Sequence, residues 1–169
     1  MIIFDKIEYL EEPLKGMIQE YLELACEMDR LLNCLTREYC AQCPRSLEYG
    51  CCNFPEEASR SMPEAIVRLQ EMESVENGGD LVSRNGLCRF HTKKGCSLVL
   101  LKSPSCFGQL CDDLRNDLRK RFGRNAEPFI EAMRKFGRKS MEKEPSELLE
   151  GMRDVIRAGK ALEDIKKSN

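Results

Sequence analysis

The sequence has no long apolar segment. No stretch approaches the roughly eighteen apolar residues that a membrane helix needs, and residues 1–8 contain neither a basic region nor the apolar core of a signal peptide. We therefore expect no membrane span, no export signal and a cytoplasmic location. In a reducing cytoplasm, closely spaced cysteines are better explained as metal ligands or reactive thiols than as disulfides. The alternative is a disulfide framework in an exported protein whose leader has been removed.

The components of common catalytic sites are also scarce. His91 is the only histidine, and no pair of carboxylates stands out as an acid and a base. Residues 77–80, Asn-Gly-Gly-Asp, are too short for a phosphate-binding loop and are better explained as a helix end and a turn. A nucleophilic Cys–His pair would have to compete with a metal for the thiols. The sequence gives little support for an enzyme.

The composition is that of an ordinary folded protein. Of the 169 residues, 41% are hydrophobic and 33% are charged, which argues against disorder. The charged residues within 1–31 are mostly acidic and those within 115–139 mostly basic, so the two regions can attract each other within the fold. We expect a single domain over residues 1–169, divided into an N-terminal helical segment (1–38), a cysteine-cluster metal-binding region (40–111) and C-terminal helices (112–169).

The first 35 residues carry a helical pattern. Apolar residues recur from Ile3 to Leu35 in alternating steps of four and three, which predicts an amphipathic helix. Pro13 interrupts the pattern, so we expect two helices or one bent helix. The apolar side packs on the protein's own core, or else pairs with a protein partner or a second copy of the chain in a coiled-coil homodimer.

Shorter elements are predicted after this helix. Residues 40–55 have no helical period and are expected to form an irregular loop. Ser61 and Glu64 form a capping box at the start of a helix that ends at residues 77–79. A β-hairpin with strands at 87–90 and 97–101 and further helices at about 109–122, 127–140 and 146–165 are predicted. The expected fold class is mainly α, an irregular metal-stapled helical domain with a minor β-hairpin.

Eight of the ten cysteines form two groups, Cys40, Cys43, Cys51 and Cys52 in the first and Cys88, Cys96, Cys106 and Cys111 in the second. A Cys-x2-Cys loop such as 40–43 can direct two sulfurs at one ion while backbone N–H groups hydrogen-bond the thiolates. Eight thiolates are enough for two closed zinc sites, for one four-cysteine cluster with four thiols left over, or for a bridged multinuclear site. Sequence order does not fix which thiols share an ion.

Three other side chains bear on the proposed ligand set. His91 follows Cys88 at Cys-x2-His spacing and is a reserve ligand, although a surface histidine in the hairpin is the preferred interpretation. Cys26 and Cys34 lie at or near the apolar side of the first helix, where a free thiol behaves as a small hydrophobic residue. Cys34 is the more probable exception because it precedes Cys40 by only six residues.

The cysteine pattern resembles that of a known family. The order Cys-x2-Cys, Cys-Cys, then Cys, Gly-Cys-x9-Cys-x4-Cys resembles the YkgJ-type cysteine-cluster family, whose members are described as zinc- or iron-chelating. The matched residues are Cys40, Cys43, Cys51, Cys52, Cys88, Gly95, Cys96, Pro104, Cys106 and Cys111. The resemblance implies an eight-cysteine metal site within residues 40–111. The chain departs from the family pattern in the longer spacing from 43 to 51 and in the position of the proline near 104.

Three functions are compatible with these features. The first is a metal-binding protein, with Zn²⁺ as the first expectation and iron as the second, whose metal is structural, sensed or delivered. The second is an iron–sulfur redox protein that supports a partner enzyme. The third is nucleic-acid binding through the basic residues Arg115, Arg119, Lys120, Arg121, Arg124, Arg134, Lys135, Arg138 and Lys139. Against the third, amphipathic helices need charged solvent-facing sides, and no nucleic-acid motif is present.

A bound metal would also contribute to folding. A structural zinc ion contributes on the order of 10 kcal/mol, which is comparable with the whole net stability of a typical domain. We therefore expect the metal-free chain to be largely unfolded between Cys40 and Cys111.

Overall fold

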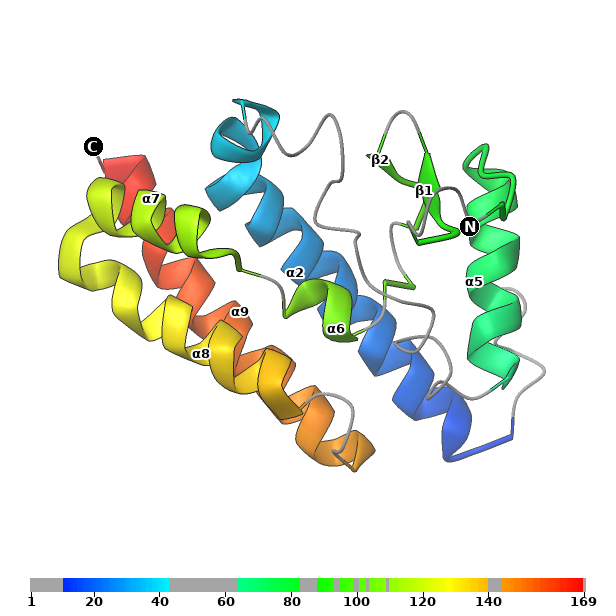
Figure 1. Ribbon diagram of the computed structural model, residues 1–169. Helices are drawn as coiled ribbons and strands as arrows, with labels where there is room; N and C mark the ends of the chain where they lie inside the picture. The colour runs from blue at the N-terminus through cyan, green and yellow to red at the C-terminus, as the bar shows by residue number, and fades with distance from the viewer. Residues whose placement is uncertain are drawn as a thin grey trace.

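The chain folds mainly into helices (Figure 1). The computed structural model describes residues 11–42, 64–82, 88–92, 95–98, 101–102, 104–108, 110–139 and 144–168. The elements are α2 (Leu14–Gln42), α5 (Glu64–Glu76), β1 (His91–Thr92), β2 (Gly95–Cys96), α6 (Pro104–Phe107), α7 (Asp112–Phe122), the 3-10 helix η1 (Gly123–Ala126), α8 (Glu127–Lys139) and α9 (Pro145–Ser168). The long helix α2 lies between the bundle of α7, α8 and α9 on one side and α5 with the short strands on the other (Figure 1).

The apolar side of α2 forms one wall of the hydrophobic core. Ala25, Met28, Leu31 and Leu35 recur at helical spacing and are almost completely buried, and α2 packs most extensively on α9. The prediction that this side faces the protein's own core is therefore confirmed. Because these side chains are buried within the chain, they are not available to a second copy in a coiled-coil homodimer.

The C-terminal helices supply the rest of this core. The predicted apolar sides of these helices are confirmed, since Leu118 of α7 and Phe129, Met133 and Phe136 of α8 are buried. Helix α9 approaches them closely at Gly159, where a Cβ atom would lie 3.2 Å from Leu31 Cδ1 and 3.3 Å from Phe129 Cε2. A glycine in the middle of a helix is thus explained by packing, because no larger residue fits without displacing a neighbour.

The predicted helix limits agree with the structure to within a few residues. Helix α5 begins at Glu64 and is followed by Gly78, which has a φ of 81° and so ends the helix in a left-handed conformation. Helix α9 begins at Pro145, a residue suited to the first turn because proline lacks the backbone N–H that would be unpaired at that position. The structure also contains α6, a single turn that the sequence did not reveal.

Two predictions about local structure were wrong. Helix α2 continues to Gln42, so Cys40 lies in its last turn and not in an irregular loop. The predicted boundary near residue 38 fails because nothing breaks the helix before Pro44, whose ring disfavours helical backbone at the preceding residue. The predicted strands at 87–90 and 97–101 are also absent from the described parts of those segments.

Strand pairing in the described chain is limited to β1 and β2. These two-residue strands are antiparallel, with His91 opposite Cys96 and Thr92 opposite Gly95. One more backbone bond continues beyond them, from Ser97 N to Phe90 O at 2.8 Å. Beyond Ser97, both backbone polar groups of Leu101 hydrogen-bond to side chains of helix α5.

None of the described helices is long and apolar enough to cross a membrane.

Candidate metal centre

The second cysteine group is carried by four different local structures. Cys88 precedes β1, Cys96 ends β2, Cys106 lies in α6, and Cys111 is the residue before α7. Of the first group, Cys40 lies in α2, although nothing is described of its side chain. Cys43, Cys51 and Cys52 lie outside the described residues, and so does the side chain of His91.

Cys88, Cys96 and Cys106 lie within electrostatic reach of one another. Burial raises the pKa of the Cys88 thiol, and the neighbouring Cys106 raises it further. Desolvation by the surrounding protein raises the pKa of Cys96 to about 11, and Cys106 and Cys88 add to this rise. Cys88 and Cys96 are therefore protonated at neutral pH, and a metal ion that bound their sulfurs would displace the protons.

Each of these thiols stands beside a residue that is anchored in the protein interior. Phe90, Leu98 and Phe107 are 4%, 2% and 1% exposed, whereas Cys96 and Cys106 are exposed and Cys88 is half-buried. Phe107 belongs to the main hydrophobic core, so α6 holds Cys106 at the edge of that core. The fold thus fixes the backbone near each thiol, while Cys96 and Cys106 remain exposed as residues.

Backbone N–H groups and nearby cations favour thiolates at two of these positions. The N–H of Phe90 donates to Cys88 and the N–H of Leu98 donates to Cys96, and each bond lowers the pKa of its thiol. Lys102 also lowers the pKa of Cys96. Hydrogen bonds from the residue two positions ahead are the kind of contact that supports metal-bound sulfur. At Cys88 and Cys96 these hydrogen bonds and cations lower the pKa by less than burial raises it.

Cys111 has a different environment from the other three. Its Sγ accepts a hydrogen bond from Leu114 N at 3.4 Å and so caps the start of α7. The half-buried residue also packs against the main hydrophobic core. The described structure therefore gives Cys111 a role in starting a helix. Among the side chains that the structure describes, no three His, Cys, Asp or Glu residues are close enough together to hold a metal ion.

Helix α5 buries a polar side that the sequence pattern did not predict. Gln70, Glu73 and Ser74 are 2%, 4% and 0% exposed, and Asn77, which is exposed and directly follows the helix, continues the same spacing. The apolar residues Leu69 and Met72 of α5 are only half-buried. The signal that could have revealed the polar side is the spacing of positions 70, 73, 74 and 77, which places them on one side of a helix.

These polar side chains bind the segment that connects Cys96 to Cys106. Ser74 Oγ lies 2.7 Å from Ser97 Oγ, and Asn77 Nδ2 donates to Ser97 O at 2.8 Å. Further along, Leu101 N donates to Glu73 Oε2 at 2.9 Å and Leu101 O accepts from Gln70 Nε2 at 2.7 Å. Side chains of α5 thus occupy the places that a neighbouring strand would otherwise take.

The side of α2 that faces away from α9 holds the same segment from the other direction. Tyr21 Oη donates to Lys102 O at 2.5 Å, and Lys102 Nζ forms an ion pair with Asp29. Burial raises the pKa of Tyr21, so its hydroxyl stays protonated and able to donate.

The two cysteines of α2 outside the two groups differ in burial. The prediction that Cys26 behaves as a small hydrophobic residue was wrong, since this residue is exposed; Cys34 is half-buried.

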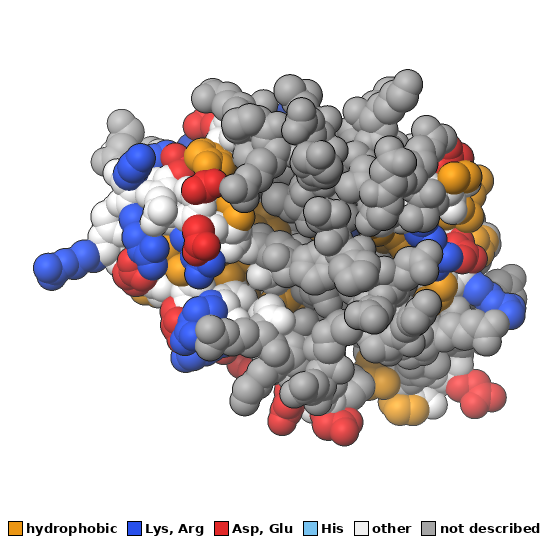
Figure 2. Space-filling view, viewed as in Figure 1, with side chains coloured by type: hydrophobic (Ala, Val, Ile, Leu, Met, Phe, Trp, Pro, Cys, Tyr) orange, Lys and Arg blue, Asp and Glu red, His pale blue; other side chains and the backbone are white. Residues whose placement is uncertain are grey.

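Four arginines of the basic region at 115–139 form ion pairs within the protein. Arg119 Nε lies 2.7 Å from Glu127 Oε1, Arg121 Nη2 lies 2.6 Å from Asp117 Oδ2, and similar pairs join Arg115 to Asp112 and Arg134 to Glu131. Acidic and basic side chains accordingly alternate over the helical side of the molecule in Figure 2. These pairs reduce the positive charge that the region offers to phosphates.

Comparison with protein-family models, curated proteins and solved structures finds no match for this chain. The resemblance of residues 40–111 to the YkgJ-type family stays a prediction. What the cysteine-rich region does must therefore be inferred from its own side chains.

Proposed function

We propose that this protein binds a thiophilic metal ion through its cysteine-rich region, with Zn²⁺ as the first candidate and iron or an iron–sulfur cluster as the second. The observation that carries the proposal is that Cys88, Cys96 and Cys106 come from separate parts of the fold and that Cys106 lies within electrostatic range of the other two. Cys106 raises the pKa of both Cys88 and Cys96, and Cys88 also raises that of Cys96. These three sulfurs alone are not grouped closely enough to hold an ion, so the proposal requires further ligands. Soft thiolate ligands select zinc, copper(I) and iron–sulfur clusters over hard cations such as Mg²⁺.

The remaining ligands would come from the first cysteine group. Cys40 lies in the last turn of α2, so this helix leads directly into the group formed by Cys40, Cys43, Cys51 and Cys52. A site that combined thiols of both groups would join α2 to the segment beyond α5. Cys111 is a weaker candidate than the other members of the second group, because its sulfur already caps α7. His91 remains in reserve.

The charges around the second group suit bound thiolates. Four thiolates around one Zn²⁺ leave a net charge of about −2. Arg89 and Lys102 each lower the pKa of a neighbouring cysteine, at Cys88 and Cys96 respectively. These cations would offset part of the negative charge of a metal–thiolate site.

A metal held only by thiolates has no open position for a substrate, so the ion would stabilise the region or be sensed or delivered. An iron–sulfur cluster would instead supply electron transfer to a partner. The reducing cytoplasm is the compartment that suits either role, since it keeps such thiols free for the metal. No contact in the described structure favours nucleic-acid binding over these possibilities.

Single cysteine-to-serine variants test the proposal. In anaerobic competition titrations with a coloured zinc chelator, Cys88→Ser, Cys96→Ser and Cys106→Ser should each weaken zinc binding at least tenfold. Cys26→Ser is the matched control, because it removes an exposed thiol of α2 outside both groups. Equal zinc affinity in the wild type, the three variants and the control would exclude the second group as ligands.

A further inference from the structure

We infer that α5 acts as a positioning helix, whose buried polar side sets the geometry of the thiols of Cys88, Cys96 and Cys106. The positioning residues are Gln70, Glu73 and Ser74 on the buried side of α5, together with Asn77, an exposed residue directly after the helix. This inference rests on the proposed metal-binding function and deepens it. It assigns a role to a side of the protein that contains no ligand of its own.

The first anchor is at Ser97, directly after Cys96. The Ser97 hydroxyl donates to Phe90 O at 2.9 Å, so its oxygen is left to accept the Ser74 hydroxyl at 2.7 Å. The Ser97 carbonyl accepts from Asn77 Nδ2 at 2.8 Å. Phe90 is in turn the residue whose N–H donates to Cys88. One chain of hydrogen bonds thus runs from α5 through Ser97 and Phe90 to the sulfur of Cys88.

The second anchor is at Leu101, between Cys96 and Cys106. Glu73 accepts from its N–H at 2.9 Å and Gln70 donates to its carbonyl at 2.7 Å, so both polar groups of this residue are held by α5. Leu101 is 1% exposed, and water cannot replace these partners easily. The anchor fixes the path of the backbone just before it enters α6, which carries Cys106.

A helix that served stability alone would bury apolar side chains at these positions. Burying a polar group is unfavourable unless it is hydrogen-bonded, and the buried Gln70 Oε1 has no hydrogen-bond partner among the described residues. The hydrogen bonds that the other polar atoms form fix one arrangement of the backbone. Here the bonds go to two residues next to, or on the way to, proposed ligands. Removing a residue that hydrogen-bonds and orients a metal ligand typically weakens metal affinity by about 10- to 100-fold.

Gly79 provides independent evidence for close packing at the first anchor. A Cβ atom at this position would lie 2.2 Å from Ser74 Oγ and 3.0 Å from Ser97 Oγ. Only glycine therefore allows the Ser74–Ser97 hydrogen bond to form as observed. The turn after α5 leaves room for that bond, and Gly79→Ala should disturb the anchor without removing any of its polar groups.

The test is a titration of the full chain with Co²⁺, followed by competition with Zn²⁺. Thiolate-to-cobalt charge-transfer absorption reports the bound sulfurs, and circular dichroism reports the helical core. We expect Ser74→Ala, Glu73→Ala and Gly79→Ala each to weaken metal binding 10- to 100-fold at unchanged core helicity. Ser74→Thr keeps the hydroxyl and should retain most of the affinity. Glu76→Ala, on the exposed side of the same helix, is the matched control.

The outcomes separate the two proposals. If the wild type binds Co²⁺ and the three variants bind it equally well, α5 does not position the thiols, but metal binding stands. If Ser74→Thr loses as much affinity as Ser74→Ala, the hydroxyl is not the operative group and the inference fails. If the wild type binds neither Co²⁺ nor Zn²⁺, both proposals are overturned. A variant that lost core helicity would also contradict the inference, which assigns α5 no part in the core of α2, α7, α8 and α9.

Discussion

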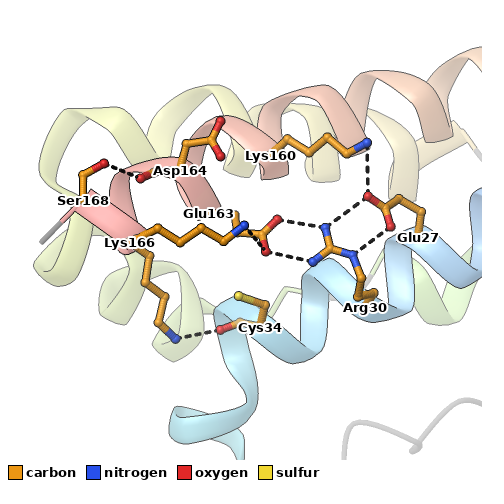
Figure 3. A network of polar contacts seen from close by, with 9 residues as sticks. Glu27, Arg30, Cys34, Lys160, Glu163, Asp164, Lys166 and Ser168 are labelled. Atoms are coloured by element: carbon orange, nitrogen blue, oxygen red, sulfur yellow. Dashed lines mark hydrogen bonds and ion pairs between the residues drawn. The ribbon is translucent and has the colours of Figure 1, made fainter.

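Arg30 of α2 and Glu163 of α9 form a two-bond ion pair across the helix interface. Arg30 Nη1 and Nη2 donate to the two carboxylate oxygens of Glu163, both at 2.8 Å (Figure 3). Arg30 also binds Glu27, which Lys160 approaches to 3.2 Å. The Arg30 guanidinium, assisted by Lys167, lowers the pKa of Glu163 to about 2. The network joins residues far apart in sequence and fastens α2 to α9.

Glu163→Gln should lower the stability of the fold in a pH-dependent way. The folded-state pKa of Glu163 lies below its ordinary value of 4.5, so the ionised carboxylate stabilises the protein above that value. This contribution is lost as the pH falls from about 4.5 towards 2. The wild type should therefore melt at a higher temperature than the variant at pH 7, and the difference should shrink towards pH 2. Thermal unfolding followed by circular dichroism measures it.

Asp154→Asn is the matched control on the same helix. Asp154 pairs with Arg157 at 2.8 Å, but both side chains are mostly exposed, so the pair should contribute little. A difference between wild type and Glu163→Gln that stayed constant from pH 7 to pH 2 would show that the Arg30–Glu163 ion pair is not its cause.

Gly137→Ala should destabilise the contact between α8 and α6. A Cβ atom at Gly137 would lie 2.8 Å from the carbonyl oxygen of Gly108, a backbone atom that cannot move without displacing the end of α6. We expect a loss of about 1–3 kcal/mol in the free energy of unfolding, typical of overpacking. Urea unfolding measures the loss.

Gly16→Ala provides the comparison for this glycine. The nearest atom to a Cβ at Gly16 is the flexible Glu12 Oε2 at 3.4 Å, an ordinary contact. Alanine in a helix is favoured over glycine by roughly 0.5–1 kcal/mol, so this variant should be unchanged or more stable. Equal effects of the two substitutions would argue against the close approach of α8 to Gly108.

Removal of the metal should loosen one side of the molecule and leave the other folded. The core of α2, α7, α8 and α9 is held by buried apolar side chains, and the described contacts of that core do not depend on a metal. Hydrogen exchange of the chelated protein should accelerate in residues 88–102 and remain slow in α8 and α9. Unchanged exchange in 88–102 after complete metal removal would contradict both a stabilising metal and the expected unfolding between Cys40 and Cys111.

The helices of the core could be predicted because their apolar residues repeat at the period of the helix. Leu118, Phe129 and Met133 are examples, since their pattern alone identifies the buried side. The C-terminal end of α2 was harder to predict, because no residue near Cys40 disfavours a helical backbone and the helix continues to Gln42. The sequence pattern thus reveals which side of a helix is apolar better than it reveals where the helix ends.

The surroundings of the thiols could be predicted only in part. The clustering of cysteines along the chain indicated a site, but only the fold brings Cys106 near Cys88 while Cys111 caps α7. The buried side of α5 was missed because polar residues are ordinarily exposed. Gln70 and Glu73 become buried by pairing with a backbone segment about thirty residues away, a partner that no local pattern reveals.

The most direct test of the central claim is the metal content of the protein purified without oxygen and without added metal. Elemental analysis, together with a visible spectrum and a count of free thiols, should find stoichiometric zinc in a colourless protein, or iron in a coloured one. Release of the metal by a chelator should make Cys88, Cys96 and Cys106 reactive to a thiol reagent. Protein that contains no transition metal, and whose thiols react equally fast before and after chelation, would contradict the account.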